Sequence, residues 1–416
     1  MISSLTNGFR SLRNRNYRLF WFGQMVSLVG TWMQDVALSW LVLSLTDSPM
    51  SLGFTMTFRF LPVMLLSLYG GVLADRLPKR KTLIATQGVQ LIVALILAIL
   101  TSTGAITVTI IYALVFLRGM VDSIDGPTRQ AFIPEMVGKD NLSNAIALNS
   151  TLFNSARIVG PAVGAAIIST LGTAACFYIN AVSFSGVIIG LLSMRPRDLH
   201  PPVWTSESES KSKLIDGFRY VRATPDVLMI IIIMSALGTF GFNSQIILPL
   251  VAKYVLSAGV SSLALLTTSM GVGSVVAGLI VAYWGKPTRR LLFTAAAVFI
   301  ALFFTLAFSS SRIMGAGLTF CIGICMVMTM TTANTRLQLL VPGHLRGRVM
   351  GMYILFFMGT TPIGSVVIGQ LAERFGVKAM IVSMAGLCLT GVLVAAIYAR
   401  KALSYHQHSA APDSHS

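Results

Sequence analysis

Apolar residues fill this chain in long, nearly unbroken runs, and short polar stretches rich in Arg and Lys separate them. A helix needs about 20 predominantly apolar residues to cross the roughly 30 Å of bilayer hydrocarbon. Runs such as 91–100 and 227–234 lack the alternation of a barrel strand, and only helices or closed barrels satisfy their own backbone inside a bilayer. The pattern predicts twelve spanning helices, at 17–45, 51–74, 82–103, 106–125, 145–170, 174–194, 227–250, 262–284, 289–309, 312–333, 346–371 and 377–400.

The composition supports an all-α integral membrane protein. Apolar residues make up 55% of the chain and charged residues 11%, which leaves too little polar surface to cover a water-soluble globule. The four cysteines all fall inside predicted helices, where they suit packing. Cys321 and Cys325 lie one turn apart without further ligands nearby, so we expect no metal site.

The net charge of +17 could suggest nucleic-acid binding, but the positions of the charges indicate otherwise. Of 31 Lys and Arg residues, 24 fall on one side of the twelve predicted helices. Cytoplasmic loops carry the Lys and Arg excess of membrane proteins, so both termini are predicted to be cytoplasmic. The first hydrophobic run is too long for a cleavable signal, and we expect it to remain as a helix.

The chain also repeats at about half its length. LPKRKTL at 77–83 and GKPTRRL at 285–291 each follow an even-numbered helix, with Pro78 and Pro287 separated by 209 positions. Two parallel repeats of six helices suit alternating access, in which the halves rock about a site between them. The predicted organisation is an N-terminal bundle at 1–194, a cytoplasmic linker at 195–226, a C-terminal bundle at 227–400 and a disordered cytoplasmic tail at 401–416. Within the linker, 214–221 has the apolar spacing of an interfacial helix, although a solvated tether fits as well.

Several motifs give the chain a family resemblance over residues 10–400. They are RNRNYRLFWFGQMVSLVGTWMQDVALSWLVL, GGVLADRLPKRK, GPTRQAFIPEMV, NSARIVGPAVG and LRGRVMGMY. With these motifs the chain resembles the major facilitator superfamily, and within it the bacterial branch of enterobactin exporters and drug–proton antiporters. The resemblance implies a monomeric transporter in the bacterial cytoplasmic membrane, surrounded by lipids, which moves a small molecule and needs no cofactor.

The charged turn after the second helix matches the first of these motifs. Asp75 lies at the C-terminal end of its helix, where the helix dipole disfavours a carboxylate, so it requires another partner. The resemblance implies that Arg346 and Arg348 at the start of helix 11 receive it, which would close the cytoplasmic side. Gly71 would let helix 2 approach a neighbour closely. Pro78 stands where the family usually has glycine, which changes the local turn.

Four ionisable residues lie deep in predicted helices, where charges are costly and normally face a cavity or a partner. Asp35 and Arg59 reach similar depths and could pair; alternatively, Asp35 could serve Arg118 or Arg157 near the midplane. Competition of proton and substrate for such a carboxylate is the chemistry of an antiporter. The resemblance likewise implies proton coupling through an acid on helix 1 and an arginine on helix 4. The proton-coupling and substrate-path candidates are Asp35, Arg59, Arg118 and Arg157.

Helix 4 carries a charged stripe made of Arg118, Asp122, Asp125 and Arg129. Their spacings of four, three and four place them on one face of the helix. It is either a gate network or a ladder of ion pairs within the helix that compensates buried charge. Together with the motif above, it completes the set of cytoplasmic gate candidates: Gly71, Asp75, Arg76, Arg80, Asp122, Asp125, Arg129, Arg346 and Arg348.

Small and kinking residues on helices 5 and 11 complete the candidates: Gly160, Pro161, Gly164, Pro362 and Gly364. Such residues permit close packing and bending where the halves meet. On helix 5 they resemble the motif of exporters, which favours export, with Ala165 in place of the usual second glycine.

Other classes of protein fit less well. The five histidines lie in loops and the tail, so no catalytic acid–base pair is predicted, and WGKPT lacks the spacing of a phosphate-binding loop. We therefore expect no enzyme and no nucleic-acid partner. The sequence predicts proton-driven export of a small amphipathic molecule such as a drug, siderophore or metabolite. The alternatives are a facilitator or importer of small organic solutes and a transport-inactive sensor.

Overall fold

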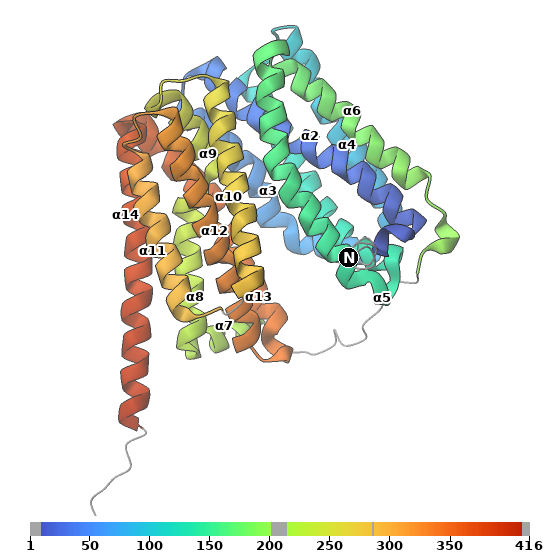
Figure 1. Ribbon diagram of the computed structural model, residues 1–416. Coiled ribbons are helices and arrows are strands. Elements are labelled where there is room, and N and C mark those ends of the chain that lie inside the picture. The colour runs from blue at the N-terminus through green and yellow to red at the C-terminus, as the bar shows by residue number, and fades with distance from the viewer. Residues whose placement is uncertain (1–9, 201–213, 285–286, 410–416) are drawn as a thin grey trace, which may run out of the picture.

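The computed structural model describes residues 10–200, 214–284 and 287–409 (Figure 1). Almost all of these residues are helical, and the helices form two groups. Helices α2 to α6 pack on one another in the first half, and α8 to α14 form the second half. Residues 201–213, which form the middle of the predicted linker, and 410–416, which end the predicted tail, lie outside the described residues.

The first half contains five labelled helices, of which α5 turns at Gly138. That residue has φ 71°, a left-handed value that glycine adopts readily, so α5 forms two legs. The elements are η1 (Arg10–Arg13), α2 (Arg15–Thr46), α3 (Pro49–Arg76), α4 (Lys79–Ser102), α5 (Val108–Leu171), α6 (Thr173–Leu192) and η2 (Pro196–Asp198).

The second half contains a second turn of this kind, at Gly376 in α14, with φ 81°. Its elements are α7 (Leu214–Ala223), α8 (Pro225–Ala236), η4 (Leu237–Gly241), α9 (Ser244–Leu250), η5 (Val251–Val255), α10 (Val260–Trp284), α11 (Arg289–Leu306), α12 (Arg312–Leu340), α13 (Gly343–Met358) and α14 (Thr361–Ser409). The predicted seventh helix is therefore α8 to η5: one short π-helical segment, η4, interrupts it, and a second, η5, ends it beyond the predicted limit at 250. The last helix runs beyond its predicted end at 400, to Ser409.

The predicted twelve-helix membrane fold is confirmed. Among the described residues, nine helical stretches are long and apolar enough to span a bilayer. One of them, Arg348–Tyr398, contains the turn at Gly376 and supplies two passes. The two legs of α5 supply the remaining two.

Local sequence signals fix where the helices begin. The side chain of Asn14 accepts hydrogen bonds from the backbone of Asn16 and Tyr17 at the start of α2. Ser48 accepts one from Ser51 at the start of α3, and Pro49 occupies the first helical position. These are the side chains that best satisfy the free N–H groups of a first turn.

The two halves meet at one end of the molecule and diverge toward the other (Figure 1). We call the diverging end the basic end; it carries the turn from Arg76 to Lys79, the turn at Gly138, and α7. The closed end, with Asp47 and Gly376, is called the opposite end.

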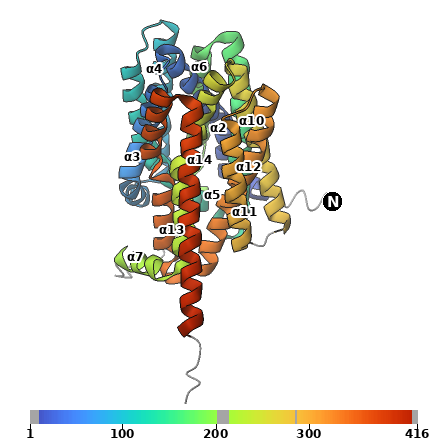
Figure 2. The same ribbon diagram turned by 90° about the vertical axis from the view of Figure 1, so that its left-hand side faces the viewer.

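Helix α7 runs across the basic end, roughly perpendicular to the spanning helices (Figure 2). Val221 is buried on its inner face, and Tyr220 Oη donates to the carbonyl of Leu340 at 3.2 Å. Phe218 remains exposed. The segment expected to form either an interfacial helix or a tether is therefore helical from Leu214 onward.

Candidate functional site

Asp35 lies in the interior of α2 and holds two arginines. Its Oδ1 atom is 2.9 Å from Nη1 of Arg59 on α3 and 2.9 Å from Nη1 of Arg118 on α5. The exposed fraction of all three side chains is below a tenth. Of the partners that the sequence left open, Asp35 thus engages both Arg59 and Arg118.

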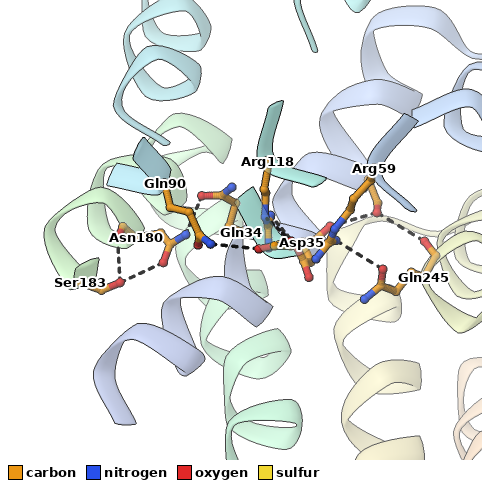
Figure 3. A network of polar contacts seen from close by, with 10 residues as sticks. Gln34, Asp35, Arg59, Gln90, Arg118, Asn180, Ser183 and Gln245 are labelled. Carbon is orange, nitrogen blue, oxygen red and sulfur yellow. Dashed lines mark hydrogen bonds and ion pairs between the residues drawn. The ribbon is translucent and has the colours of Figure 1, made fainter. Parts of the chain in front are cut away.

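This cluster belongs to a row of polar side chains that runs from Ser183 on α6 to Gln245 on α9 (Figure 3). On one side of α2, the Gln34 Oε1 atom accepts a 2.6 Å hydrogen bond from Asn180 of α6. Asn180 Oδ1 in turn accepts from Ser183. Gln90 of α4 donates to Asp122 at 2.9 Å. We call this row the midplane belt: Gln34, Asp35, Arg59, Gln90, Arg118, Asp122, Asn180, Ser183 and Gln245.

The belt reaches from one half of the protein to the other through Gln245 of α9. Arg59 Nη1 lies 3.5 Å from Gln245 Oε1, and Ser39 Oγ lies 3.4 Å from the Gln245 carbonyl oxygen. Arg59 therefore touches both Asp35 and Gln245, and it connects the carboxylate to the contact between the halves.

A cavity lies beside the belt, between the halves, with about 430 Å³ of atom-free space when the part open to solvent is included. Arg157 of α5 reaches it, with its guanidinium carbon 5.9 Å from the centroid of the Trp32 ring. The wall is mostly apolar, with a few hydroxyl and amide groups. It is lined by Trp32, Asp35, Val36, Ser39, Arg157, Pro161, Ser244, Gln245, Leu248, Pro249, Leu263, Thr267 and Met270.

The charged stripe on the first leg of α5 makes contacts inside the first half. Arg118 Nε is 3.8 Å from Asp122, and Arg129 pairs with Asp125, so the intrahelical ladder is present. Asp125 also accepts from Thr86 at 2.6 Å and Gln87 at 2.9 Å, both on α4. The stripe therefore ties α5 to α4 in this conformation.

The charged turn after α3 is likewise engaged within the first half. Arg80 donates to the carbonyls of Leu191 and Leu192 at 2.7 and 3.0 Å, where a cation suits the end of α6. Lys79 Nζ lies 2.8 Å from Glu135. Arg76 is exposed, and Arg348 on α13 is half-buried. The side chains of Asp75 and Arg346 lie outside the described part of the structure.

The close approach expected at Gly71 is made by its neighbour. A Cβ on Gly70 would overlap the carbonyl oxygen of Ser123 on α5, so Gly70 is the residue that lets α3 and α5 touch. Gly71 points elsewhere, because no described atom lies within 4 Å of a Cβ built on it. Among the residues that the structure describes, its small size therefore has no packing role in this conformation.

The small residues of helix 5 also pack differently from the expectation. Gly160 and Gly164 lie against Trp32 and Met33 of α2, so they join two helices of the first half rather than the two halves. Gly364 lies against Thr239 in the second half. At the contact between halves, Pro161 lines the cavity, and the Pro362 carbonyl accepts a 3.1 Å hydrogen bond from Thr57.

Charged residues that the sequence did not single out join the halves at the opposite end. Lys253 Nζ lies 2.8 Å from Asp47 Oδ1 and donates to the Leu43 carbonyl at 2.6 Å. Tyr254 Oη donates to Asp47 Oδ1 at 2.8 Å. The hydrogen bonds from Lys253 and Tyr254, with the charge of Lys253, lower the pKa of the Asp47 carboxyl.

Glu373 makes a second link beside this one. It accepts from Ser48 Oγ at 2.9 Å and from the Met50 backbone N–H at 3.2 Å, so an acid of the second half caps the first turn of α3. One turn deeper, Gly53 and Gly369 lie against each other. We call these contacts the opposite-end seal: Asp47, Ser48, Gly53, Lys253, Gly369 and Glu373.

The sequence contained a usable signal for some of these residues. An amide or carboxylate inside an otherwise apolar helix, such as Gln34, Gln90 or Asn180, marks a polar contact at that depth. Within the described ranges, no group of three or more His, Cys, Asp or Glu side chains could hold a metal ion.

This chain is similar to known proteins over most of its length. Residues 6–414 match the protein family described as "Transmembrane secretion effector". The chain is 24% identical over 382 residues to the staphyloferrin A transporter of Staphylococcus aureus (strain NCTC 8325 / PS 47), covering 90% of this chain and 94% of that protein. It is 23% identical to the multidrug efflux pump Tap of Mycolicibacterium fortuitum, covering 88% and 91%.

A third relative is the enterobactin exporter EntS of Shigella boydii serotype 18, 24% identical over 386 residues, with 91% of this chain and 90% of that protein covered. Among solved structures, a bacterial homologue of the human lysosomal transporter Spinster has a TM-score of 0.75 at 12% identity. That comparison covers 94% of this chain and 97% of the other, and shows that the fold is shared.

Proposed function

Because this chain belongs to the transmembrane secretion effectors of the major facilitator superfamily, we propose that it is a secondary active transporter that exports a small amphipathic molecule in exchange for protons. Relatives named as an enterobactin exporter and a multidrug efflux pump support export. The single observation that carries proton coupling is the Asp35 carboxylate, shared by two buried arginines beside a cavity between the halves.

The chemistry follows from the number of charges in the cluster. Removing one partner of a buried ion pair costs about 3–5 kcal/mol, because the remaining charge is left uncompensated. Protonation of Asp35 would leave Arg59 and Arg118 without their shared carboxylate. Arg59 already touches Gln245 of the second half, so its release would alter the contact between halves. Proton binding is in this way coupled to rearrangement.

The orientation follows from the positive-inside rule, which places the basic end in the bacterial cytoplasm. The described conformation then faces inward: the opposite-end seal closes the outer side, and the cavity can load from the cytoplasm. An exporter binds its cargo in this state. We expect one chain to suffice, since helices of a single chain bound the cavity.

The cytoplasmic gate would form only after the rearrangement. We propose that closure brings the end of α3, with Gly71, Asp75 and Arg76, against α13, with Arg346 and Arg348. The stripe of Asp122, Asp125 and Arg129 and the Arg80 contact to α6 would keep the first half rigid while it rotates. Bistable contacts of this kind are what a switch between two states needs.

The test measures the uptake of ethidium, rhodamine 6G and staphyloferrin A into inside-out vesicles, driven by a proton gradient. Wild-type protein should accumulate at least one compound, and the uptake should collapse with the gradient. Asp35→Asn should abolish gradient-driven uptake, because the shared carboxylate can no longer exchange a proton. Asp140→Asn is the matched control, since Asp140 is exposed and lies outside the belt.

The outcomes separate the alternatives. A facilitator would keep downhill flux in Asp35→Asn, and a sensor would show no flux in either protein. Gradient-driven uptake that survives Asp35→Asn would place the coupling carboxylate elsewhere.

A further inference from the structure

We propose that the cavity selects molecules carrying an anionic group, and that Arg157 is the cation that anchors it. This inference rests on the proposed transport function and names the class of its substrate. It begins from the charge of Arg157, which the midplane belt leaves uncompensated.

Arg157 differs from the other two deep arginines in its partners. Arg59 and Arg118 share Asp35, and Arg118 also lies 3.8 Å from Asp122. Arg157 instead lies over the Trp32 ring, and in the described ranges no carboxylate comes within 4 Å of it. An aromatic face offsets only part of the cost of a charge at this depth.

The belt and cavity together therefore carry an excess of positive charge. Three guanidinium groups stand against the two carboxylates of Asp35 and Asp122. Asp35 lines the cavity, but its Oδ1 atom is already occupied by two donors. A cationic group at Asp35 would lie close to Arg59 and Arg118, which already hold this carboxylate, and their repulsion disfavours it. An anion would meet Arg157 without such a competitor.

The rest of the wall indicates the form of that anion. Leu248, Leu263 and Met270 offer an apolar surface from the second half, and Trp32 and Val36 offer one from the first. The hydroxyl group of Ser244 provides a donor for a further oxygen, whereas Thr267 Oγ1 donates to the Leu263 carbonyl at 2.7 Å. Carboxylates and other oxyanions accept paired hydrogen bonds from a guanidinium, so an amphipathic oxyanion fits this lining.

Arg157 also lies where a bound ligand can contact both halves of the protein. It lies on the second leg of α5, whose neighbouring residue Ile158 packs against Gly271 of α10. A ligand held between Arg157 and the α9 and α10 side chains would contact both halves at once. This is the position required of a substrate in alternating access.

The experiment compares two fluorescent probes that differ in one group, 1-pyrenebutyrate and 1-pyrenebutanol. Equilibrium binding is measured with the full chain in lipid nanodiscs by energy transfer from tryptophan to pyrene, with empty nanodiscs as the blank. Wild-type protein should bind the carboxylate at least about tenfold more tightly than the alcohol, as expected for a charged hydrogen bond.

Three variants give the readout. Arg157→Gln should reduce the preference to about one, with binding of the alcohol unchanged. Arg157→Lys should keep most of the preference for the carboxylate, because the positive charge remains. Arg312→Gln, which removes an exposed arginine at the start of α12, should behave as wild type. Unchanged alcohol binding in Arg157→Gln shows that the variant is folded.

Equal affinity of wild-type protein for the two probes, no binding of pyrenebutyrate, or a preference that survives Arg157→Gln would each overturn the proposal. Equilibrium binding requires no proton gradient. If the protein prefers the carboxylate but shows no gradient-driven uptake in vesicles, proton-driven export is refuted and the anion site is retained. If it shows gradient-driven uptake but no preference for the carboxylate, the anion site is refuted and proton-driven export is retained.

Discussion

Two aspartates join different parts of the molecule at different depths, and their surroundings give them different roles. Asp35 is buried with two arginines, so any loss of its charge is costly and must be accompanied by rearrangement. Asp47 is exposed at the opposite end, where water screens its pairing with Lys253. The first is suited to coupling, and the second to a weak, reversible lock.

The pH response of the lock can be predicted from Asp47. Its pKa is lowered by Lys253 and Tyr254 of η5, with Glu373 as the neighbouring acid from α14. A carboxyl whose pKa is lowered stabilises the closed seal fully above its ordinary pKa of about 4, and the stabilisation is lost as pH falls through the lowered value. The Asp47 contacts should therefore not respond to pH between about 8 and 5.

The measurement is the distance between spin labels at Leu171→Cys and Phe375→Cys, two exposed positions on opposite halves. Asp47→Asn should populate longer distances at neutral pH, and Asp140→Asn should not. If wild-type protein opened between about pH 8 and 5 to the same extent as Asp47→Asn, the role given to Asp47 would be wrong.

Which residues are deep was predictable, but their pairing was not. Hydropathy placed Asp35, Arg59, Arg118 and Arg157 inside spanning helices, and the cost of buried charge made contacts among them expected. The choice of partners depends on helix rotation and on the relative position of the halves. For the same reason, the sequence indicated neither the link through Gln245 nor the seal.

At the scale of elements, the opposite-end seal depends on two helices that approach closely. A Cβ on Gly53 of α3 would lie 2.6 Å from the Ser365 carbonyl oxygen and 3.2 Å from the Gly369 Cα atom of α14. Neither helix has a side chain that could withdraw, since the nearest atoms belong to the backbone. Any larger residue must push the helices apart.

Gly53→Leu should therefore open the opposite end. Overpacking of this kind costs about 1–3 kcal/mol, which is enough to shift a balanced two-state equilibrium roughly 5- to 150-fold. The Leu171 and Phe375 labels should move apart, with the thermal stability of the protein nearly retained. Gly386→Leu is the control, because no described atom lies within 4 Å of a Cβ there. An unchanged label distance in Gly53→Leu would contradict the close packing of α3 and α14.

The helices themselves were largely predictable, because the length of an apolar run fixes a span almost independently of tertiary contacts. Their irregularities were not. Leu237–Gly241 and Val251–Val255 form π-helical segments inside the seventh span, although no residue type there demands it. The close contact of Gly70 rather than Gly71 likewise depends on how α3 is rotated against α5.

At the scale of the whole molecule, one glycine lies at each end, and the two have opposite surroundings. Gly53 is tightly packed at the closed end, and at the basic end no described atom lies within 4 Å of a Cβ built on Gly71. Both lie on α3, so one helix contacts the second half at its start and diverges from it toward its end (Figure 1). Rocking of the halves would exchange these environments.

Gly71→Leu should therefore act in the opposite sense to Gly53→Leu. In the described conformation the new side chain meets open space, so folding and binding from the basic end should be unchanged. Closure of the basic end would force it against α13, so the switch should be blocked and transport lost. Labels at Lys139→Cys and Leu339→Cys, exposed positions at the basic end, should keep their long distance.

The double variant decides whether the two ends are coupled. If the halves move as rigid bodies, Gly53→Leu alone should shorten the Lys139 to Leu339 label distance while it lengthens the pair at the opposite end. Adding Gly71→Leu should oppose both changes, because each conformation then contains one overpacked contact. Independent responses of the two label pairs, or wild-type transport by Gly71→Leu, would show that the ends open separately and that alternating access by rigid halves does not describe this protein.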